Sequence, residues 1–319
     1  MNATTSTPWE ITSTVLYNYP NNYSTNAYYS CAYGYQVNHV LTALYSLFFV
    51  VGFIGNALVV WVITVGAQLQ SMTDVCLLNL ALADLLLVLS LPFMIYQINH
   101  GWIFGDIMCT MYRGVYYVGF YGGIFFIVLT SIDKYLAIVH AVFALRVRTK
   151  TFGIVASLSI WTLAVAASFP ELLNITVRKK FTPFCCVSTN FTSFVIFKRN
   201  IVGLLVPLII VGFCYLMVLL RLHKLCSPKK HSMHLVVLIM VVFLSCWTPY
   251  NIAEFHRGLQ IIPNSRNQII LVVKICKAVA VSHSCLNPFL YVFVGEKYRK
   301  HFLKLIRERQ FVCCSKRTT

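Results

Sequence analysis

The sequence predicts an all-α membrane protein, a bundle of seven transmembrane helices followed by an amphipathic eighth helix. Hydrophobic residues make up 58% of the chain and charged residues only 11%, a composition that cannot give a soluble globule a polar surface. The apolar residues gather in seven stretches, most of them reaching the roughly 20 residues that a bilayer span needs. The last stretch contains Asn287 and the helix-breaking Pro288, which hydrocarbon tolerates only where neighbouring helices satisfy the freed backbone groups.

The seven predicted spans end near Gly, Pro, Asn or charged residues, which place their boundaries to within a few residues. In chain order they are Val40–Val65, Val75–Ile98, Ile107–Val139, Phe152–Phe169, Ile201–Leu222, Leu235–Leu259 and Ile269–Val294. The second, fifth, sixth and seventh spans contain Pro92, Pro207, Pro249 and Pro288 in turn. Each proline is expected to break its helix and to create a kink.

Positive charge orients the bundle. Near the span ends, one side of the predicted membrane has sixteen Lys and Arg residues and the other side has seven. The positive-inside rule therefore places the C-terminus in the cytoplasm and the N-terminus outside. Much of the net charge of +17 then serves orientation and contact with anionic membrane lipid, and nucleic acid is not an expected partner.

The N-terminal segment fits an extracellular position. Its first 38 residues contain no Lys or Arg and no apolar stretch of the kind that a cleavable signal peptide requires, so the first span is expected to act as its own anchor. Four Asn-x-Ser/Thr tripeptides all fall on the external side, and they are either N-glycosylation sites or chance occurrences. They begin at Asn2, Asn22, Asn174 and Asn190.

The cysteines divide by compartment. Cys109 opens the third span, and Asp133 follows 24 residues later, a helical rise of about 36 Å that crosses a ~30 Å core. Cys109 therefore lies at the outer surface, where it can pair with Cys185 or Cys186 in the long loop after the fourth span. The spacing of the cysteines does not resemble a metal or redox site, and the sequence contains no arrangement of nucleophiles that would indicate an enzyme.

Polar residues inside the spans are expected to face the bundle interior, because exposure to lipid costs several kcal/mol. They are Asn56, Asp84, His283 and Asn287. Asp84 has two interpretations. It is either a carboxylate satisfied by neighbouring amides, or an ion or water site, for which sodium is the candidate. No other cofactor is expected.

Motifs in all seven spans resemble those of the rhodopsin-like (class A) G-protein-coupled receptors. They are Asn56, Leu80–Asp84, Asp133-Lys134-Tyr135, Trp161, Pro207 with Tyr215, Cys246–Pro249 and Asn287–Tyr291. More narrowly, five segments resemble a CC-type chemokine receptor: Ser71–Val75, Trp102–Gly105, Asp133–Val147, Ser282–Pro288 and Phe293–Lys297. The resemblance implies signalling roles for Asp84, Asp133, Lys134, Tyr135, Tyr215, Trp247, Pro249, Asn287, Pro288 and Tyr291.

The resemblance implies a plasma-membrane receptor that binds an extracellular CC-type chemokine and couples to an inhibitory-type heterotrimeric G protein. Tail tyrosines, among them Tyr17, Tyr19 and Tyr23, would bind the body of the chemokine, and the chemokine's flexible N-terminus would enter the bundle. The implied pocket residues are Tyr45, Tyr96, Trp102, Arg113, Tyr116, Tyr117, Glu254 and Lys277, with Trp247 beneath them. Each aromatic residue taken alone fits a lipid-interface or packing role equally well.

Three positions depart from the family pattern. Lys134 replaces the Arg between Asp133 and Tyr135, and an ammonium lacks the planar fork of a guanidinium, so coupling is expected to be weakened or altered. Lys277 stands where many relatives have Glu, and together with Arg113 and Lys274 it makes the pocket basic and suited to a carboxylate or an acidic side chain; the alternative is a Lys that snorkels from the end of its helix. Relatives also pair an N-terminal Cys with one before the seventh helix, but residues 260–267 contain no Cys. Cys31 is therefore expected to pair with whichever of Cys185 and Cys186 remains, or to stay free.

Two other functions compete with a signalling receptor. The nearer alternative is a decoy that binds chemokine with little G-protein signalling, because Lys134 replaces the family Arg. A multi-pass transporter is more distant, since the sequence lacks the paired broken helices of an inverted repeat and Asp84 is the only acid deep in a predicted span.

The outer side is expected to be poor in acidic residues. Those expected there are Glu10, Asp106, Glu171 and Glu254.

The chain thus divides into an extracellular tail (1–38), a seven-transmembrane receptor domain (39–295), and helix eight with a short cytoplasmic tail (296–319). Basic and apolar residues interleave after Gly295, as in a helix that lies on anionic lipid. Cys313 and Cys314 are predicted palmitoylation sites. Few phosphate acceptors follow, so control by arrestin is expected to be weak. Such a compact receptor is consistent with a virus-encoded protein.

Overall fold

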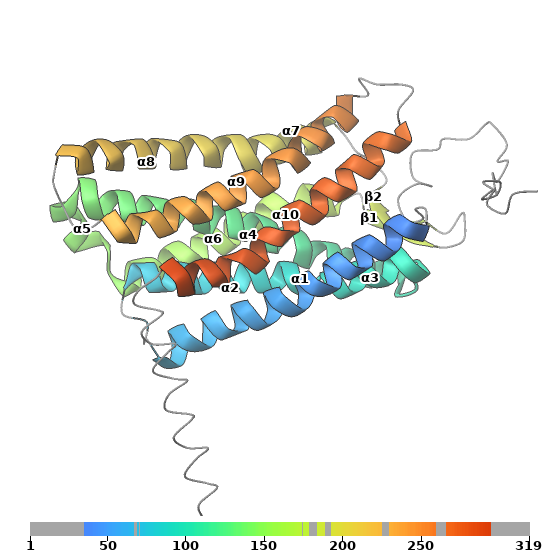
Figure 1. The fold of residues 1–319 in the computed structure, drawn as a ribbon, viewed down its shortest axis with the longest axis horizontal. Coiled ribbons are helices and arrows are strands. Elements are labelled where there is room, and N and C mark those ends of the chain that lie inside the picture. The colour runs from blue at the N-terminus through green and yellow to red at the C-terminus, as the bar shows by residue number, and fades with distance from the viewer. Residues whose placement is uncertain are drawn as a thin grey trace, which may run out of the picture.

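The computed structural model describes residues 35–66, 69, 71–173, 175–178, 184–188, 193–224, 230–259 and 266–294. Long helices lie side by side along one direction and form a bundle (Figure 1). The α-helices are α1 (Tyr35–Trp61), α2 (Met72–Leu89), α3 (Leu91–His100), α4 (Gly105–Val139), α5 (Ala141–Val147), α6 (Lys150–Leu172), α7 (Ser193–Asn200), α8 (Val206–Lys224), α9 (Lys230–Leu259) and α10 (Arg266–Val294). Two π-helical segments, Val62–Gly66 and Ile201–Leu205, extend α1 and join α7 to α8.

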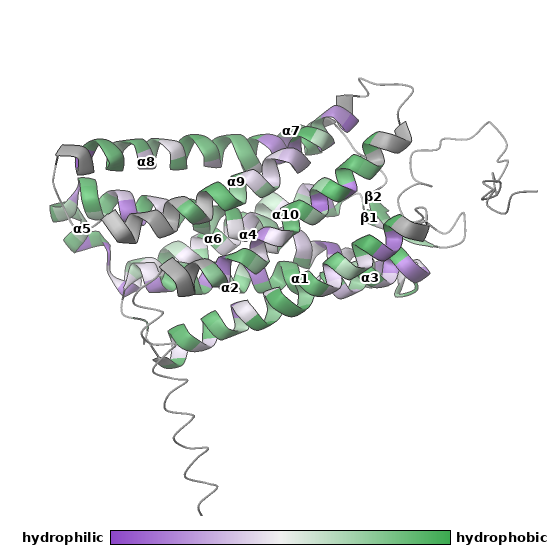
Figure 2. Ribbon diagram, in the orientation of Figure 1, coloured by the Kyte–Doolittle hydropathy of each residue, from purple (hydrophilic) through white to green (hydrophobic). Residues whose placement is uncertain are grey.

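The predicted seven-helix architecture is confirmed. Within the described residues, five segments are long and apolar enough to cross a membrane: Val37–Val65, Met72–His100, Gly105–Val139, Lys150–Leu172 and Phe194–Arg221. Helices α9 and α10, 30 and 29 residues long, contain the sixth and seventh predicted spans. Hydrophobic residues cover the outer helices, α8 and α1 among them (Figure 2). On α8, for example, Ile209 is 61% exposed and Phe213 53%, as expected of residues that face lipid.

Two of the four prolines interrupt their spans as predicted. The second span divides at Ser90, which ends α2, while Pro92 occupies the first turn of α3, where its missing N–H costs nothing. In the fifth span a π-helical segment precedes Pro207. Pro249 and Pro288 instead lie inside continuous helices, α9 and α10, so these helices are not interrupted there, and the kinks expected at the two prolines stay predictions.

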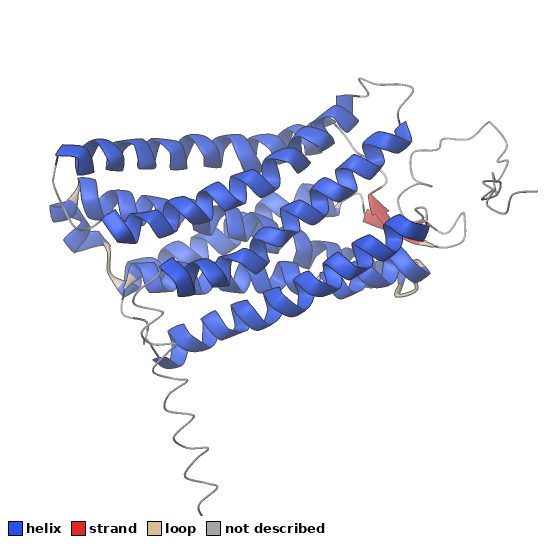
Figure 3. Cartoon of the chain, in the orientation of Figure 1, coloured by secondary structure: helices blue, strands red, loops and turns tan. Residues whose placement is uncertain are grey.

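The loop after α6 is partly a β-hairpin, which the expectation of an all-α chain did not include. Strand β1 (Ile175–Arg178) pairs antiparallel with β2 (Cys185–Ser188), at the end of the bundle where α1 begins and α3 ends (Figures 1 and 3). Because this hairpin is anchored by contacts from elsewhere in the chain, hydropathy alone does not reveal it. Asp106 at the start of α4 accepts a hydrogen bond from the backbone N–H of Val177 (2.8 Å).

The disulfide between Cys109 and Cys186 joins α4 to β2, with Cα atoms 5.6 Å apart. This settles which cysteine of the vicinal pair Cys109 selects. Cys185 is also disulfide-bonded, and Cys31, its partner in the expected pairing, lies outside the described residues.

Several other predicted features also fall outside the described residues. They are the tail residues Tyr17, Tyr19 and Tyr23, the sequons at Asn2, Asn22, Asn174 and Asn190, the eighth helix, and the acylation candidates Cys313 and Cys314. The side chain of Tyr291 also falls outside the described part of the structure, although its backbone belongs to α10.

Helices α2 and α4 approach each other closely at Gly119. A Cβ at this position would lie 2.8 Å from the carbonyl oxygen of Ala83 and 2.8 Å from the backbone nitrogen of Leu87. Any larger residue would push the two backbones apart, because neither contact is with a flexible side chain. Close packing here holds the middle of α4 against α2, between the outer pocket and the cytoplasmic end.

Candidate functional site

The predicted pocket residues come from five helices, α1, α3, α4, α9 and α10, and from the connection between α3 and α4. Arg113 on α4 donates a hydrogen bond from Nη2 to the carbonyl oxygen of Cys186 (3.0 Å), which ties the disulfide-anchored strand to the pocket. Tyr116 and Tyr117 follow on α4, with ring centroids 5.2 Å apart. On α10, the Lys277 ammonium lies 4.5 Å from the centroid of the Tyr116 ring. The structure therefore brings together the predicted pocket residues of α4 and α10.

Glu254, predicted as a pocket acid, is already engaged by two arginines. Its Oε2 atom lies 3.1 Å from Nη2 of Arg199 and 2.6 Å from Nη2 of Arg257. The Arg199 guanidinium is also 5.5 Å from the centroid of the Tyr250 ring. Glu254 is 3% exposed and Arg199 2% exposed, so Glu254 is buried within the outer part of the bundle and does not lie on its surface. Its charge balances the protein's own cations.

A second carboxylate that was expected on the outer side is buried as well. Glu171 at the end of α6 is 3% exposed, accepts a hydrogen bond from the Tyr121 hydroxyl (2.7 Å) and forms an ion pair with Lys198. The adjacent residues Lys198 and Arg199 therefore reach in two directions, to α6 and to α9. The sequence alone did not reveal that these two cations pair with the two acids.

The other aromatic pocket candidates mainly pack against one another. Trp102 is 1% exposed, and its indole N–H donates to the carbonyl oxygen of Gly105 (2.8 Å). Its ring contacts those of Phe93, Phe104 and Tyr112. Tyr96 contacts His100 and Phe104, and Tyr45, 2% exposed, packs edge-on against Phe48. Among these described contacts, Trp102, Tyr96 and Tyr45 support the pocket wall.

Trp247 lies deeper, between the pocket and Asp84. Its ring centroid is 4.3 Å from that of Phe120 on α4, one helical turn below Tyr116. Its indole N–H donates to Nδ1 of His283 (3.0 Å). The Nε2 atom of the same imidazole lies 3.6 Å from Oδ1 of Asp84. These contacts connect the predicted switch residue to the buried carboxylate.

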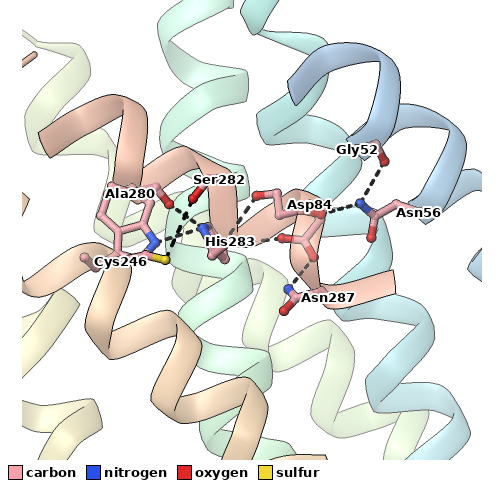
Figure 4. A network of polar contacts seen from close by, with 10 residues as sticks. Gly52, Asn56, Asp84, Cys246, Ala280, Ser282, His283 and Asn287 are labelled. Atoms are coloured by element: carbon pink, nitrogen blue, oxygen red, sulfur yellow. Dashed lines mark hydrogen bonds and ion pairs between the residues drawn. The ribbon is translucent and has the colours of Figure 1, made fainter. Parts of the chain in front are cut away.

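Asp84 lies in a polar network between α1, α2 and α10 (Figure 4). Asn287 donates from Nδ2 to Oδ2 of Asp84 (2.7 Å). Asn56 donates from its own Nδ2 to the carbonyl oxygens of Ser284 (2.8 Å) and Gly52 (2.9 Å). The motif residues of the first, second and seventh spans thus meet, as the predicted interior positions require.

The surroundings of Asp84 do not fit a sodium ion well. Hard cations prefer a shell of oxygen ligands, but the described groups around the two carboxylate oxygens are the nitrogens of Asn287 and His283 and a single hydroxyl, that of Ser284. This favours the first interpretation, a carboxylate satisfied by its neighbours.

At the opposite end of the bundle, Asp133 is bound by Arg148 and not by the adjacent Lys134. Arg148 makes a bidentate contact, with Nε 2.6 Å from Oδ1 and Nη2 3.2 Å from Oδ2. This hydrogen bonding raises the pKa of the Arg148 guanidinium, which lies in the connection before α6. Thr73 on α2 also donates to Oδ2 of Asp133 (2.6 Å), while the hydrogen bond of Lys134 within the described residues is to the Thr73 hydroxyl (3.4 Å).

The other predicted signalling residues differ in how far they are buried. Tyr135 contacts Nε2 of His140 through its hydroxyl (3.0 Å) and packs against Phe213 on α8. Tyr215 on α8 is half-buried, Pro288 is buried and Pro249 is exposed. Sequence analysis did not identify Arg148 or Thr73. Arg binds a carboxylate through two parallel hydrogen bonds. Once Lys134 was recognised as a departure from the family, a nearby Arg was therefore the partner to look for.

Replacing Arg148 by Gln is expected to lower the free energy of unfolding by about 1–3 kcal/mol, because the fully buried Asp133 would lose its charged partner while Thr73 stays bonded to it. Thermal unfolding of the purified protein in lipid nanodiscs measures this change. Arg146→Gln is the matched control, since Arg146 is exposed in the last turn of α5. Equal unfolding temperatures for the two variants would contradict the role of Arg148.

Comparisons with known proteins agree with this arrangement. Residues 55–291 match the family described as 7 transmembrane receptor (rhodopsin family). The chain is 41% identical to the human C-C chemokine receptor type 1 over 294 residues, which cover 87% of this chain and 81% of that protein. It is 43% identical to the human C-C chemokine receptor type 4 over 288 residues, which cover 86% and 80%.

Proposed function

Because the chain belongs to the rhodopsin family of seven-transmembrane receptors, and within it to the C-C chemokine receptors, we propose that it binds a CC-type chemokine at the cell surface and couples to an inhibitory-type heterotrimeric G protein. It is a multi-pass membrane receptor and not an enzyme. The plasma membrane, with the N-terminus outside, is its proposed location.

One observation carries the proposal, a continuous series of contacts from the outer pocket to the motif residues of α10. Lys277 lies against Tyr116, and Phe120, one turn further along α4, packs on Trp247. Trp247 bonds His283, which lies next to Asp84, and Asp84 is bonded by Asn287. A ligand that binds differently to two arrangements of this series shifts the population between them.

The proposal includes sites outside the described residues. Tail tyrosines Tyr17, Tyr19 and Tyr23 bind the chemokine body, the four sequons are glycosylated, and Cys313 and Cys314 anchor the lipid-bound tail. Cys31 closes the second outer disulfide with Cys185. Arrestin engages the short tail weakly.

A panel of CC-type chemokines tests the function. Cells that express the chain are expected to lower cAMP and raise cytosolic calcium in response to at least one of them, while untransfected cells do not respond. Uptake of labelled chemokine is measured in the same cells. Uptake without any second-messenger response would reject the signalling proposal in favour of the decoy.

The decoy is retained as a second candidate because of Lys134. Within the described residues its ammonium hydrogen-bonds to Thr73, and in the family an Arg at this position offers the G protein several directional hydrogen bonds. A point charge retains reach and charge but makes fewer contacts, so reduced but nonzero coupling is proposed.

Replacing Lys134 by Arg is therefore expected to raise agonist-stimulated signalling, by up to about tenfold if the guanidinium adds about 1.4 kcal/mol of contact energy. Nucleotide exchange on an inhibitory-type G protein, measured at matched surface expression, checks this. No signal from either protein at saturating bound chemokine would favour the decoy. A lower signal from Lys134→Arg than from wild type would show that this account of Lys134 is wrong.

A further inference from the structure

The outer half of the bundle contains more positive charge than its own carboxylates can balance. Glu254 already pairs with Arg199 and Arg257, and Glu171 pairs with Lys198. Arg113 and Lys277 have no ion pair with any described carboxylate. Lys277 contacts the Tyr116 ring, and Arg113 stands three residues before Tyr116 on α4, so the two cations lie in the same region of the bundle. Burying like charges in a medium of low dielectric is costly unless an anion joins them.

Neither cation is satisfied by its present contacts. Lys277 lies against the Tyr116 ring and 3.5 Å from Sδ of Met94, which are weak partners for an ammonium with three donors. Arg113 uses Nη2 on the Cys186 carbonyl, but its buried Nε has no hydrogen-bond partner among the described residues. The guanidinium therefore has unused donors.

The Tyr116 hydroxyl is a third hydrogen-bond donor beside Arg113 and Lys277. The Tyr116 hydroxyl is buried and has no partner within the described part of the chain, and Tyr116 is only 3% exposed. Arg113 and Tyr116 stand three residues apart on α4, so their side chains share one face of the helix. Lys277 approaches that face from α10 through its contact with the Tyr116 ring.

We propose that Arg113, Tyr116 and Lys277 form a binding site for a carboxylate. A carboxylate carries two oxygens with about four acceptor positions, and hydrogen bonds from charged donors are the strongest that it can accept. An ammonium group would meet two like charges and no free acid here. The proposal rests on the proposed chemokine-receptor function and defines the chemistry of its pocket: the part of the ligand that enters the bundle presents an acidic group.

The carboxylate has two possible sources, an acidic side chain of the protein ligand or a free small molecule. Thermal unfolding of the purified receptor in nanodiscs tests the second source without knowledge of the chemokine. Sodium phenylacetate and phenethylamine hydrochloride are suitable probes, because they are similar in size and opposite in charge. Phenylacetate at ten times its Kd is expected to raise the unfolding temperature by about 2–5 °C, and phenethylamine is expected to have no effect.

Arg113→Gln and Lys277→Gln are expected to abolish the phenylacetate shift. Lys150→Gln keeps it, since Lys150 is exposed at the start of α6 and serves as the matched control. Equal shifts with both probes, or no shift with either, would overturn binding of free carboxylates. Either result would leave only the ligand's own acidic group, which the second arm tests.

The second arm uses the chemokine that the panel identifies, at matched surface expression. Lys277→Glu is expected to reduce its potency by at least about tenfold, while Lys277→Arg, which keeps the charge, costs less than about threefold. Acetylation of the chemokine's N-terminal amine is expected to leave potency unchanged at wild type. Equal effects of Lys277→Glu and Lys277→Arg overturn the proposal for the protein ligand.

The two arms also separate this proposal from the function itself. A receptor that responds to the panel but shows no charge preference in either arm remains a chemokine receptor without a carboxylate site. A receptor stabilised by phenylacetate that responds to none of the panel retains the site and loses the proposed ligand class. If Lys277→Glu fails to reach the surface, Lys277→Gln replaces it in the comparison with Lys277→Arg.

Discussion

Cells that express the Cys109→Ala variant at the wild-type surface level are expected to bind no chemokine above background. The disulfide to Cys186 closes a chain separation of 77 residues, a constraint of about 4–5 kcal/mol in the loop-closure description. It also positions the Cys186 carbonyl, which accepts hydrogen bonds from Arg113 (3.0 Å) and Gln97 (3.4 Å). Without the bridge, the strand above the pocket loses its attachment to α4.

Binding of labelled chemokine to intact cells measures this loss. Cys214→Ala is the matched control, because Cys214 is a buried, unbridged cysteine on α8, and it should retain wild-type affinity. Undiminished binding by Cys109→Ala at equal surface expression would show that the hairpin is held without its disulfide.

Glu254→Gln is expected to lower the unfolding temperature on the order of 10 °C. The substitution leaves Arg199, 2% exposed, without a carboxylate, and removing one member of a buried ion pair costs about 3–5 kcal/mol. Arg257→Gln should cost much less, since the side chain of Arg257 is 28% exposed and the pair between Arg199 and Glu254 survives.

A double variant, Arg199→Gln with Glu254→Gln, tests the cause of the destabilisation. Removing both charges should recover part of the loss, because the unpaired buried cation is gone. If Glu254→Gln is as stable as wild type, or if the double variant unfolds at a lower temperature than Glu254→Gln alone, the ion pair is not the source of the effect.

The helices were predictable from the sequence because lipid imposes a simple rule. A span must be apolar on its outside and satisfy its backbone internally, so hydropathy locates it. Hydropathy does not locate a helix in the same way where other parts of the protein, and not lipid, surround it. Residues 193–200 contain Lys198 and Arg199 and therefore resemble a loop, yet they form α7 because the two cations pair with Glu171 and Glu254. Such pairs depend on helix positions that one sequence does not reveal.

The candidate site was predictable in composition but not in pairing. Arg113, Tyr116 and Lys277 do come together, as the family resemblance of their positions implied. Glu254 was expected to be available to a ligand, whereas its partners come from α7 and from its own helix one turn away. The partner of Asp133 was not predicted either, and it is Arg148 from the connection between α5 and α6. Which cation a carboxylate pairs with depends on which basic side chains the fold brings within hydrogen-bonding distance.

The ionic attachment of α7 to both neighbours has a mechanical consequence for α9. Glu254 fixes the outer end of α9 to Arg199, and Lys198 fixes α7 in turn to α6. Pro249 lies five residues before Glu254 and lacks a backbone N–H, so the helix is weakest just inside its fixed end. A long helix that is fixed at one end and bends easily next to that end is displaced most at its other end. Small rearrangements around Trp247 would therefore be amplified along α9 towards the cytoplasm.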